Sequence, residues 1–295
     1  MGKDNVWMAI ALSLLALTLF DAMGLVIKLL SPRYSSAELT AWRNLFGLIP
    51  SALALWFSSG WQRQGRPLRM RQWKLALTRG MIVVLAQLCF YTSLSVLAFA
   101  TASALSYANA LFMTALAVPL LGERVGAVRW SAVLVGFAGV VLIMQPGSDS
   151  FSIYALLPVG AALFYALMGV SARMIDEDVP TPLLNLYSNA ASSVCAFVMA
   201  LGFGGFTPLH NLTDLAWIAA MGGFGGVAVL CMVVAFRMTE QSNLAPFSYF
   251  GIPIAFVLGW IFFDEAPWSD LFPGAPLIIV GGLLIVWRER GKAKP

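Results

Sequence analysis

The chain contains an internal repeat, in which residues 100–145 resemble residues 242–290. Each segment consists of an apolar run with scattered polar residues, an acidic turn, and a second apolar run that contains glycine. At a shift of 142 positions, the matched residues are Ser106-Tyr107 with Ser248-Tyr249, Gly122-Glu123 with Asp264-Glu265, and Gly139 with Gly281. A period of about half the chain predicts two similar structural halves. In a membrane protein such halves typically surround a central site.

The composition is that of a membrane protein. Sixty per cent of the 295 residues are hydrophobic and 11% are charged, with a mean hydropathy of +0.82, whereas soluble domains have roughly 25% charged residues. The net charge of +4 comes from basic residues in short links between apolar runs, where they indicate membrane topology rather than a phosphate-binding face. We therefore expect the lipid bilayer as a partner and no nucleic acid.

Apolar runs of about 20 residues, long enough to cross the hydrocarbon, recur along the chain. Breaks at charges, prolines and glycine clusters predict an all-α integral membrane protein with ten transmembrane helices, at residues 5–30, 36–58, 72–97, 101–121, 127–145, 151–174, 181–203, 213–236, 243–263 and 270–288. The break between residues 97 and 101 has almost no turn signal, and only the repeat predicts it.

The distribution of Lys and Arg predicts the orientation of these spans. Basic residues gather in the link after the second span and in the C-terminal tail, while acidic residues gather in the opposite links. We expect a multi-pass protein of the inner (plasma) membrane with both termini cytoplasmic. Because five spans per half is an odd number, the halves 1–147 and 148–295 enter the membrane in opposite orientations, as two inverted five-helix repeats within one membrane domain.

Several absences narrow the function. The single histidine, His210, lies in a predicted link, so a histidine-based metal site is not expected. The sequence has no phosphate-binding loop for ATP hydrolysis and no pair of membrane acids. We therefore predict that the chain is not an enzyme and needs neither a cofactor nor a metal, and a monomer suffices for this hypothesis.

The polar face of span four is the first candidate for contact with a substrate. Ser103, Ser106 and Tyr107 are spaced three and four residues apart, which places them on one face of a continuous helix. The repeat adds Ser248 and Tyr249 at matched positions. Such polar stripes also form ordinary hydrogen bonds between helices, worth about 0.6 kcal/mol on average in one membrane protein, and this alternative stays open.

Asp21 is the only acidic residue well inside a predicted span. A carboxylate at this depth costs about 2.5–3.5 kcal/mol on insertion scales unless it is paired or hydrated. One interpretation is a proton carrier, or an anion that faces a substrate ammonium group. The other is a structural ion pair with Lys28, two helical turns away on the same face, or with Arg43.

Pro246, Gly251 and Pro253 interrupt span nine. Helix breaks of this kind free backbone carbonyls, which bind ligand groups only where a cavity or a neighbouring segment satisfies them. Proline and glycine are also common in ordinary membrane spans, so the break alone does not define a site.

These residues resemble the drug/metabolite transporter superfamily, in its EamA-type branch, over nearly the whole chain. The motif positions are Trp42-Arg43, Gly122-Glu123-Arg124, Gly136 to Gly139, Pro253, Asp264-Glu265 and Gly281-Gly282. The resemblance implies ten helices around a cavity lined mainly by spans one, three, four, six, eight and nine. Within the branch, the chain is similar to the YddG-type amino-acid exporters. It departs from the family pattern in span four, where Leu111 replaces a frequent proline.

The combined hypothesis is a secondary transporter that exports small metabolites by alternating access. Amino acids with aromatic or large neutral side chains are the expected substrates. Nucleosides, sugars or cationic compounds are alternatives, and a non-transporting scaffold or receptor is the alternative from another class. The residues expected to bind substrate are Gln87, Tyr91, Ser103, Ser106, Tyr107, Asn109, Phe164, Tyr165, Ser248 and Tyr249.

Overall fold

The computed structural model describes residues 4–65, 68–122, 126–147, 151–172, 174–176, 179–238, 244 and 247–292, and this part of the chain contains helices and no strand. In chain order the elements are α1 (Asp4–Leu30), α2 (Ser36–Trp56), α3 (Ser59–Arg63), α4 (Trp73–Leu94), α5 (Phe99–Ser106), α6 (Asn109–Leu121), α7 (Ala127–Met144), the single turn η1 (Ile153–Ala155), α8 (Leu156–Ala172), α9 (Thr181–Gly202), α10 (Leu212–Met238), α12 (Gly251–Phe263), α13 (Trp268–Leu271) and α14 (Gly274–Lys292).

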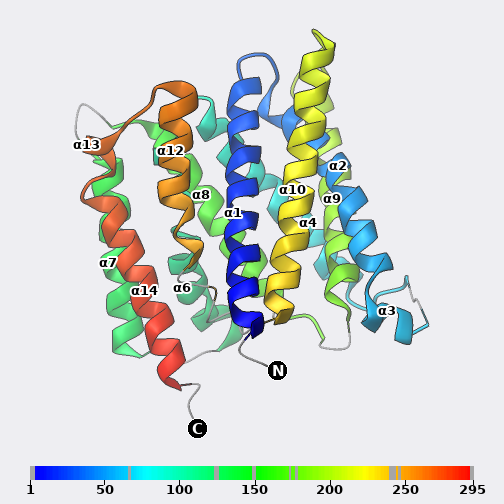
Figure 1. Cartoon of the computed structure of the whole chain (residues 1–295), viewed down its shortest axis with the longest axis horizontal. Helices are drawn as coiled ribbons and strands as arrows, with labels where there is room; N and C mark the ends of the chain where they lie inside the picture. Colours follow the sequence, from blue (N-terminus) through cyan, green and yellow to red (C-terminus); the bar gives the residue numbers. More distant parts are fainter. Residues whose placement is uncertain are drawn as a thin grey trace.

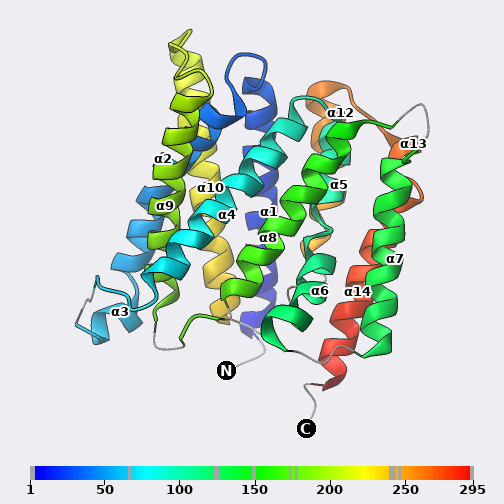
Figure 2. The same cartoon turned by 180° about the vertical axis from the view of Figure 1, so that it is seen from behind.

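The long helices form one bundle with α1 in the middle of a face, between α12 and α10 (Figure 1). The helices α7 and α14 form one edge of the bundle, and α2 and α9 form the other. On the reverse face, α4 and α8 run obliquely across the bundle beside α5 and α6 (Figure 2). Helix α1 begins and α14 ends at the same end of the molecule, which we call the termini end; the other is the opposite end.

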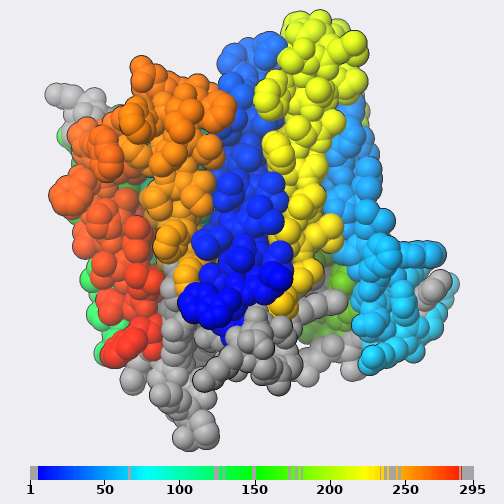
Figure 3. Space-filling view, viewed as in Figure 1, coloured from blue at the N-terminus to red at the C-terminus, as the bar shows by residue number. Residues whose placement is uncertain are grey.

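The helices are apolar over lengths that match a bilayer. Six segments of the described chain are long and apolar enough to cross a membrane: Val6–Leu30, Trp73–Leu94, Phe99–Leu121, Ile153–Ser171, Pro182–Gly202 and Leu212–Met232. Three shorter apolar helices are Trp130–Met144, Gly251–Phe263 and Gly274–Ile285. Figure 3 shows α12, α1, α10 and α2 side by side across one face, with α14 at its edge beside α12. Large apolar side chains are exposed on these helices, which is the surface that lipid covers. The chain is a multi-pass membrane protein.

Glycines allow α7 and α14 to pack backbone against backbone. A Cβ atom on Gly139 would lie 2.5 Å from the carbonyl oxygen of Gly274, and one on Gly281 would lie 2.7 Å from that of Ala132. Any side chain at these positions would separate the helices, so both glycines serve close packing. Gly139 matches Gly281, and Ala132 matches Gly274, at the 142-residue shift of the repeat. The two contacts are therefore equivalent.

The fourth predicted span, residues 101–121, is not one helix. It begins earlier, at Phe99, and divides into α5 and α6 at a turn formed by Tyr107 and Ala108. The amide of Ala108 donates to the carbonyl of Leu105 there. In the second half the matching turn precedes α12, at Tyr249 and Phe250, and the amide of Phe250 donates to the carbonyl of Phe247. Both matched runs therefore break at their tyrosine.

The opposite end is connected by polar contacts around the link between α1 and α2. Arg33 forms an ion pair with the buried carboxylate of Asp214 at 2.6 Å, and the Tyr34 hydroxyl donates to the same carboxylate at 2.9 Å. Burial raises the pKa of Tyr34, which keeps this hydroxyl protonated as a donor. Ser35 and Glu38 form a capping box that starts α2. These contacts fix α1, α2 and α10 relative to one another.

Candidate substrate site

The two repeat-matched tyrosines, one just after α5 and one just before α12, lie close to each other. Their ring centroids are 6.2 Å apart, with the planes inclined at 43°. The Tyr107 hydroxyl lies against Gly251, where a Cβ atom would be only 1.5 Å away, and the Tyr249 hydroxyl lies against Gly282, where a Cβ would be 1.6 Å away. Glycine at each position makes room for a phenol. The helix breaks thus bring two hydroxyl-bearing rings from different halves together.

Asp21 lies in the middle of α1 and is 9% exposed. Its Oδ2 atom is buried without a hydrogen-bond partner among the described residues, and its charge acts on the Tyr107 hydroxyl. Lys28, the partner considered for an ion pair, binds Glu265 instead, and Arg43 is not within ion-pair distance of Asp21. A buried carboxylate without a cation is costly, so this group is available for a ligand or a proton.

A second polar group lies on α2 and α4. The side-chain amides of Asn44 and Gln87 exchange two hydrogen bonds, of 2.8 and 3.0 Å, and both residues are buried. Arg43 donates to the Asn44 carbonyl oxygen at 3.1 Å. Its charge also acts on the hydroxyls of Tyr91 on α4 and Tyr165 on α8. The predicted residues Gln87, Tyr91 and Tyr165 therefore all lie near the Arg43 side chain.

Lys28 connects the two halves at the opposite end. Its ammonium group contacts both carboxylate oxygens of Glu265, at 2.6 and 2.8 Å, and donates to the carbonyl of Leu97 at 2.7 Å. Glu265 also accepts from the amide of Phe99, the first residue of α5, at 2.8 Å. One ion pair thus joins α1, the start of α5 and the link after α12.

The remaining predicted residues occupy different settings. Ser103 is buried, and the Ser106 hydroxyl donates to its carbonyl at 2.7 Å. Tyr107, the residue after α5, keeps helical backbone angles, and its amide still donates to the carbonyl of Ser103 at 3.3 Å. Asn109, Phe164 and Ser248 are half-buried at the start of α6, on α8 and before α12, respectively. Pro246 lies outside the described residues, and Pro253 is exposed in the first turn of α12, after the break.

Comparison with known proteins identifies the family. A model of the EamA-like transporter family matches residues 7–145 and again residues 152–287. The chain belongs to the EamA-like transporter family. Its members are transporters, so this EamA-like protein is a small-molecule transporter and not an enzyme, as the sequence predicted.

Relatives of this EamA-like transporter are named for three different cargoes. It is 25% identical over 280 residues to an S-adenosylmethionine uptake transporter of Rickettsia bellii, covering 94% of this chain and 92% of the relative. It is 30% identical over 225 residues to a riboflavin transporter of Rhizobium johnstonii (74% and 72%). It is 25% identical over 293 residues to the pseudopaline exporter CntI of Pseudomonas aeruginosa (99% and 100%).

A solved structure shares the fold of this EamA-like transporter, with a TM-score of 0.65 at 18% identity, covering 97% of this chain and 99% of the other. At this identity the likeness concerns the fold alone. The cargo must be argued from the residues of this chain.

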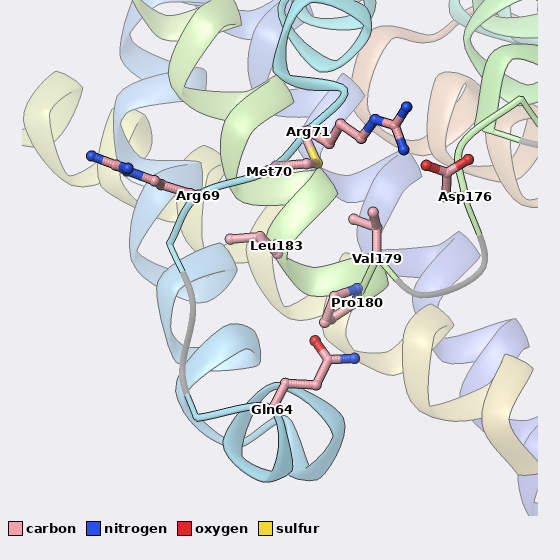
Figure 4. Close-up of a pocket in the computed structure, with 8 residues that line it drawn as sticks. All are labelled: Gln64, Arg69, Met70, Arg71, Asp176, Val179, Pro180 and Leu183. Atoms are coloured by element: carbon pink, nitrogen blue, oxygen red, sulfur yellow. The ribbon is translucent and has the colours of Figure 1, made fainter.

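A pocket of about 250 Å³ lies apart from the central tyrosines (Figure 4). It is at the termini end, between the link that precedes α4 and the start of α9. Its lining residues are Gln64, Arg69, Met70, Arg71, Asp176, Val179, Pro180 and Leu183. None of the predicted substrate residues lines it. We place the candidate site instead at the group formed by Asp21, Tyr107 and Tyr249.

Sequence reasoning missed several contacts that the predicted residues make. The sequence pattern does not single out Asn44, and it gives Gly282 only as part of a glycine pair. Nothing in a single sequence shows that Asn44 would face Gln87 on another helix, or that Gly282 would receive the Tyr249 ring. The spacing of Tyr249 and Gly282 across two spans has no local pattern, because the contact depends on how the helices pack.

Proposed function

We propose that this EamA-like transporter exports amino acids with large neutral or aromatic side chains across the inner membrane by alternating access. The proposed topology is ten spans with both termini cytoplasmic, arranged as inverted repeats of residues 1–147 and 148–295. The substrate occupies the centre of the bundle, between the broken helices. Asp21 receives its ammonium group, and the Tyr107 ring contacts its side chain.

The observation that supports this most is the meeting of Tyr107 and Tyr249 beside an unpaired carboxylate. Broken membrane helices tend to lie at binding sites, because freed backbone groups need a polar partner. Here both breaks occur at matched positions and bring the two aromatic rings close to each other. Asp21, whose charge acts on Tyr107, supplies the only acidic charge of that region among the described residues. An aromatic, negatively charged environment suits a cation attached to an apolar side chain.

The helix contacts support the inverted repeat. Helix α1 packs along α10 as α8 packs along α4, and α2 contacts α10 as α9 contacts α4. Matching the spans of the two halves in order pairs α1 with α8, α2 with α9 and α4 with α10. The first contact of each pair is then equivalent to the second. An odd number of spans per half makes the halves antiparallel. Arg69 and Arg71, in the link before α4 at the termini end, support a cytoplasmic location for that end.

The names of the relatives include uptake and export, so direction is part of the proposal. The opposite end of the bundle is joined by Lys28 and Glu265. An exporter loads its cargo from the cytoplasm, and a conformation closed at the far end is the one that loads. An importer releases its cargo from the same conformation, so the direction of transport is proposed from the sequence hypothesis.

The test is release from proteoliposomes preloaded with a mixture of the twenty common amino acids. We expect selective release of a few large neutral or aromatic ones, which protein-free liposomes do not show. Release of none, together with transport of nucleosides, sugars or cationic compounds, would reject the amino-acid assignment and keep the transporter. Transport of none of these compounds would reject all of the substrate classes named here.

Cysteine labelling tests the central location separately. Ser106→Cys and Ser248→Cys should react with small aqueous reagents added from one face or the other, and saturating substrate should slow the reaction. Leu53→Cys on the lipid-facing side of α2 is a control that substrate should not affect. Absence of reaction from both faces at both serine positions would reject a central water-filled path.

A further inference from the structure

Three residues of α1 line up between the candidate site and the opposite end. Gly24 and Lys28 follow Asp21 by three and seven positions, so the three lie within about 60° of one another around the helix. Because α1 begins at the termini end, Gly24 is about 4.5 Å and Lys28 about 10.5 Å closer to the opposite end than Asp21. Whatever covers Gly24 and Lys28 therefore covers the way out from Asp21 to that end.

The ring of Phe99, the first residue of α5, covers Gly24. A Cβ atom on Gly24 would lie 3.1 Å from Cε2 of this ring, and a Cβ on Gly259 of α12 would lie 3.5 Å from the Phe99 Cβ. Phe99 is 1% exposed, and its ring centroid is 6.4 Å from that of Phe263. The two glycines leave the space that this ring fills between α1 and α12. Phe99 thus closes the bundle one helical turn beyond Asp21.

The Lys28–Glu265 ion pair lies about one further turn toward the opposite end. Glu265 stands in the link after α12, and its carboxylate accepts from both the Lys28 ammonium and the Phe99 amide. The Lys28 side chain is 12% exposed, and its ammonium lies 5.0 Å from the centre of the Phe263 ring. One carboxylate therefore connects the end of α12 to α1 and to α5. Separating α12 from α1 at this end must break the pair.

A second ion pair at the same end has a different setting. Arg33 and Asp214 connect the link after α1 to the first turn of α10. Helices α1 and α10 pack along each other (Figure 1), so this pair joins two helices that are already in continuous contact. It involves neither α12 nor Phe99. The two pairs thus allow the closure around Phe99 to be tested against an ordinary tie between helices.

We propose that Phe99 and the Lys28–Glu265 pair form the gate at the opposite end of the transporter. In the closed gate the Phe99 ring separates Asp21 from that end, and the cargo passes only after Glu265 leaves Lys28 and the Phe99 amide. The inference rests on the proposed function, which places the cargo at Asp21 and moves it by alternating access.

The test is the rate at which Ser106→Cys reacts with a membrane-impermeant methanethiosulfonate added to one face of membrane vesicles. A tag at the C-terminus shows which vesicles expose the termini end. Combining Ser106→Cys with Glu265→Gln should raise the ratio of the opposite-end rate to the termini-end rate about tenfold. The reason is that the variant loses a contact made only in the closed conformation, and the equilibrium shifts by that difference. Lys28→Met removes the same pair from the other side and should act alike.

Arg33→Met is the matched control, because it removes the other ion pair of this end and leaves the contacts of Phe99 and Glu265 in place. The ratio of the two rates should stay within a factor of two of that for Ser106→Cys alone. The protein without Ser106→Cys gives the background from its three half-buried native cysteines.

A disulfide tests the closure independently. The Cβ separation of 3.5 Å between positions 99 and 259 suits a disulfide, so Phe99→Cys combined with Gly259→Cys should join α5 to α12 on oxidation. Release of amino acids from proteoliposomes should then fall at least tenfold and return with dithiothreitol, while the wild type should not respond to either reagent. Undiminished release from the cross-linked protein would overturn the gate.

The outcomes separate the two proposals. If Ser106→Cys reacts and Glu265→Gln leaves the ratio of rates unchanged, the ion pair is a static tie and this inference is overturned. An equal change in Arg33→Met overturns it as well. If Ser106→Cys reacts from neither face in any of these variants, the central path of the proposed function fails, and the gate fails with it.

Discussion

The two helix breaks share a position in the repeat but differ in what surrounds their tyrosines. Tyr249 is 5% exposed and belongs to an apolar core with Ile278 and Ile285 of α14, where its hydroxyl fills the space above Gly282. Tyr107 is only partly buried, and its hydroxyl crosses to Gly251 in the other half. The position that matches Gly282 in the first half is Val140, which offers no such space.

The repeat therefore gives the two tyrosines the same position in the chain, while the residues around them hold each one differently. The same phenol packs into its own half in one copy and reaches the shared centre in the other. We therefore expect Tyr249 to matter for folding and Tyr107 for the cargo, although the sequence predicted substrate contact for both. Variants at the two positions test the comparison directly.

The largest effect is expected from Gly282→Ala. The new Cβ would lie 2.0 Å from the Cζ atom of Tyr249, and the buried ring has nowhere to move, so overpacking should cost about 3 kcal/mol. Thermal unfolding in detergent should show a clear fall in the unfolding temperature. Gly251→Ala is the matched variant, and its cost should be smaller because the partly buried Tyr107 tip can swing away. Equal losses in the two variants would contradict the division of roles.

The next largest effect is expected at the Lys28–Glu265 ion pair, which holds the start of α5. Glu265→Gln keeps an acceptor for the Phe99 amide and removes the charge that neutralises Lys28, whose side chain is 12% exposed. Because the pair is only partly buried, we expect a loss of about 1–2 kcal/mol rather than the larger cost of a fully buried pair. Thermal unfolding measures it, with the exposed neighbour Asp264→Asn as the control. An unfolding temperature equal to that of the control would show that the ion pair does not hold α5.

Much of the fold was visible in the sequence, because membrane helices are specified by local composition. The apolar runs, the position of the break before α5 and the glycines of α7 and α14 follow from length, polarity and the repeat. The division of the fourth span was not visible, since Leu111 replaces the proline that would have indicated it. The Lys28–Glu265 pair was also missed, because the two residues are far apart in sequence and Asp21 offered a nearer partner. Long-range packing decided both.

A smaller effect is expected from removing single hydroxyls at the two breaks. Tyr107→Phe loses one hydrogen bond to the cargo, worth about 1 kcal/mol, so the half-saturating substrate concentration for release should rise about fivefold. Tyr249→Phe should leave that concentration within a factor of two and act on the unfolding temperature instead. Proteoliposome release over a range of internal substrate concentrations measures both. A larger rise for Tyr249→Phe would reverse the assignment of roles.

The smallest effect is expected from Pro253→Ala, and it decides whether proline causes the break in the second half. In the first half the amide of Leu111 donates to the carbonyl of Ala108, and the chain breaks there without a proline. Pro253 stands at the matching position, where its missing N–H and its exposed ring lie in the first turn of α12, a place that tolerates proline. The turn should therefore survive, with a stability change within about 0.5 kcal/mol and release rates within a factor of two. A large fall in release with an unchanged unfolding temperature would show instead that the proline keeps the second break open, and that the two halves break for different reasons.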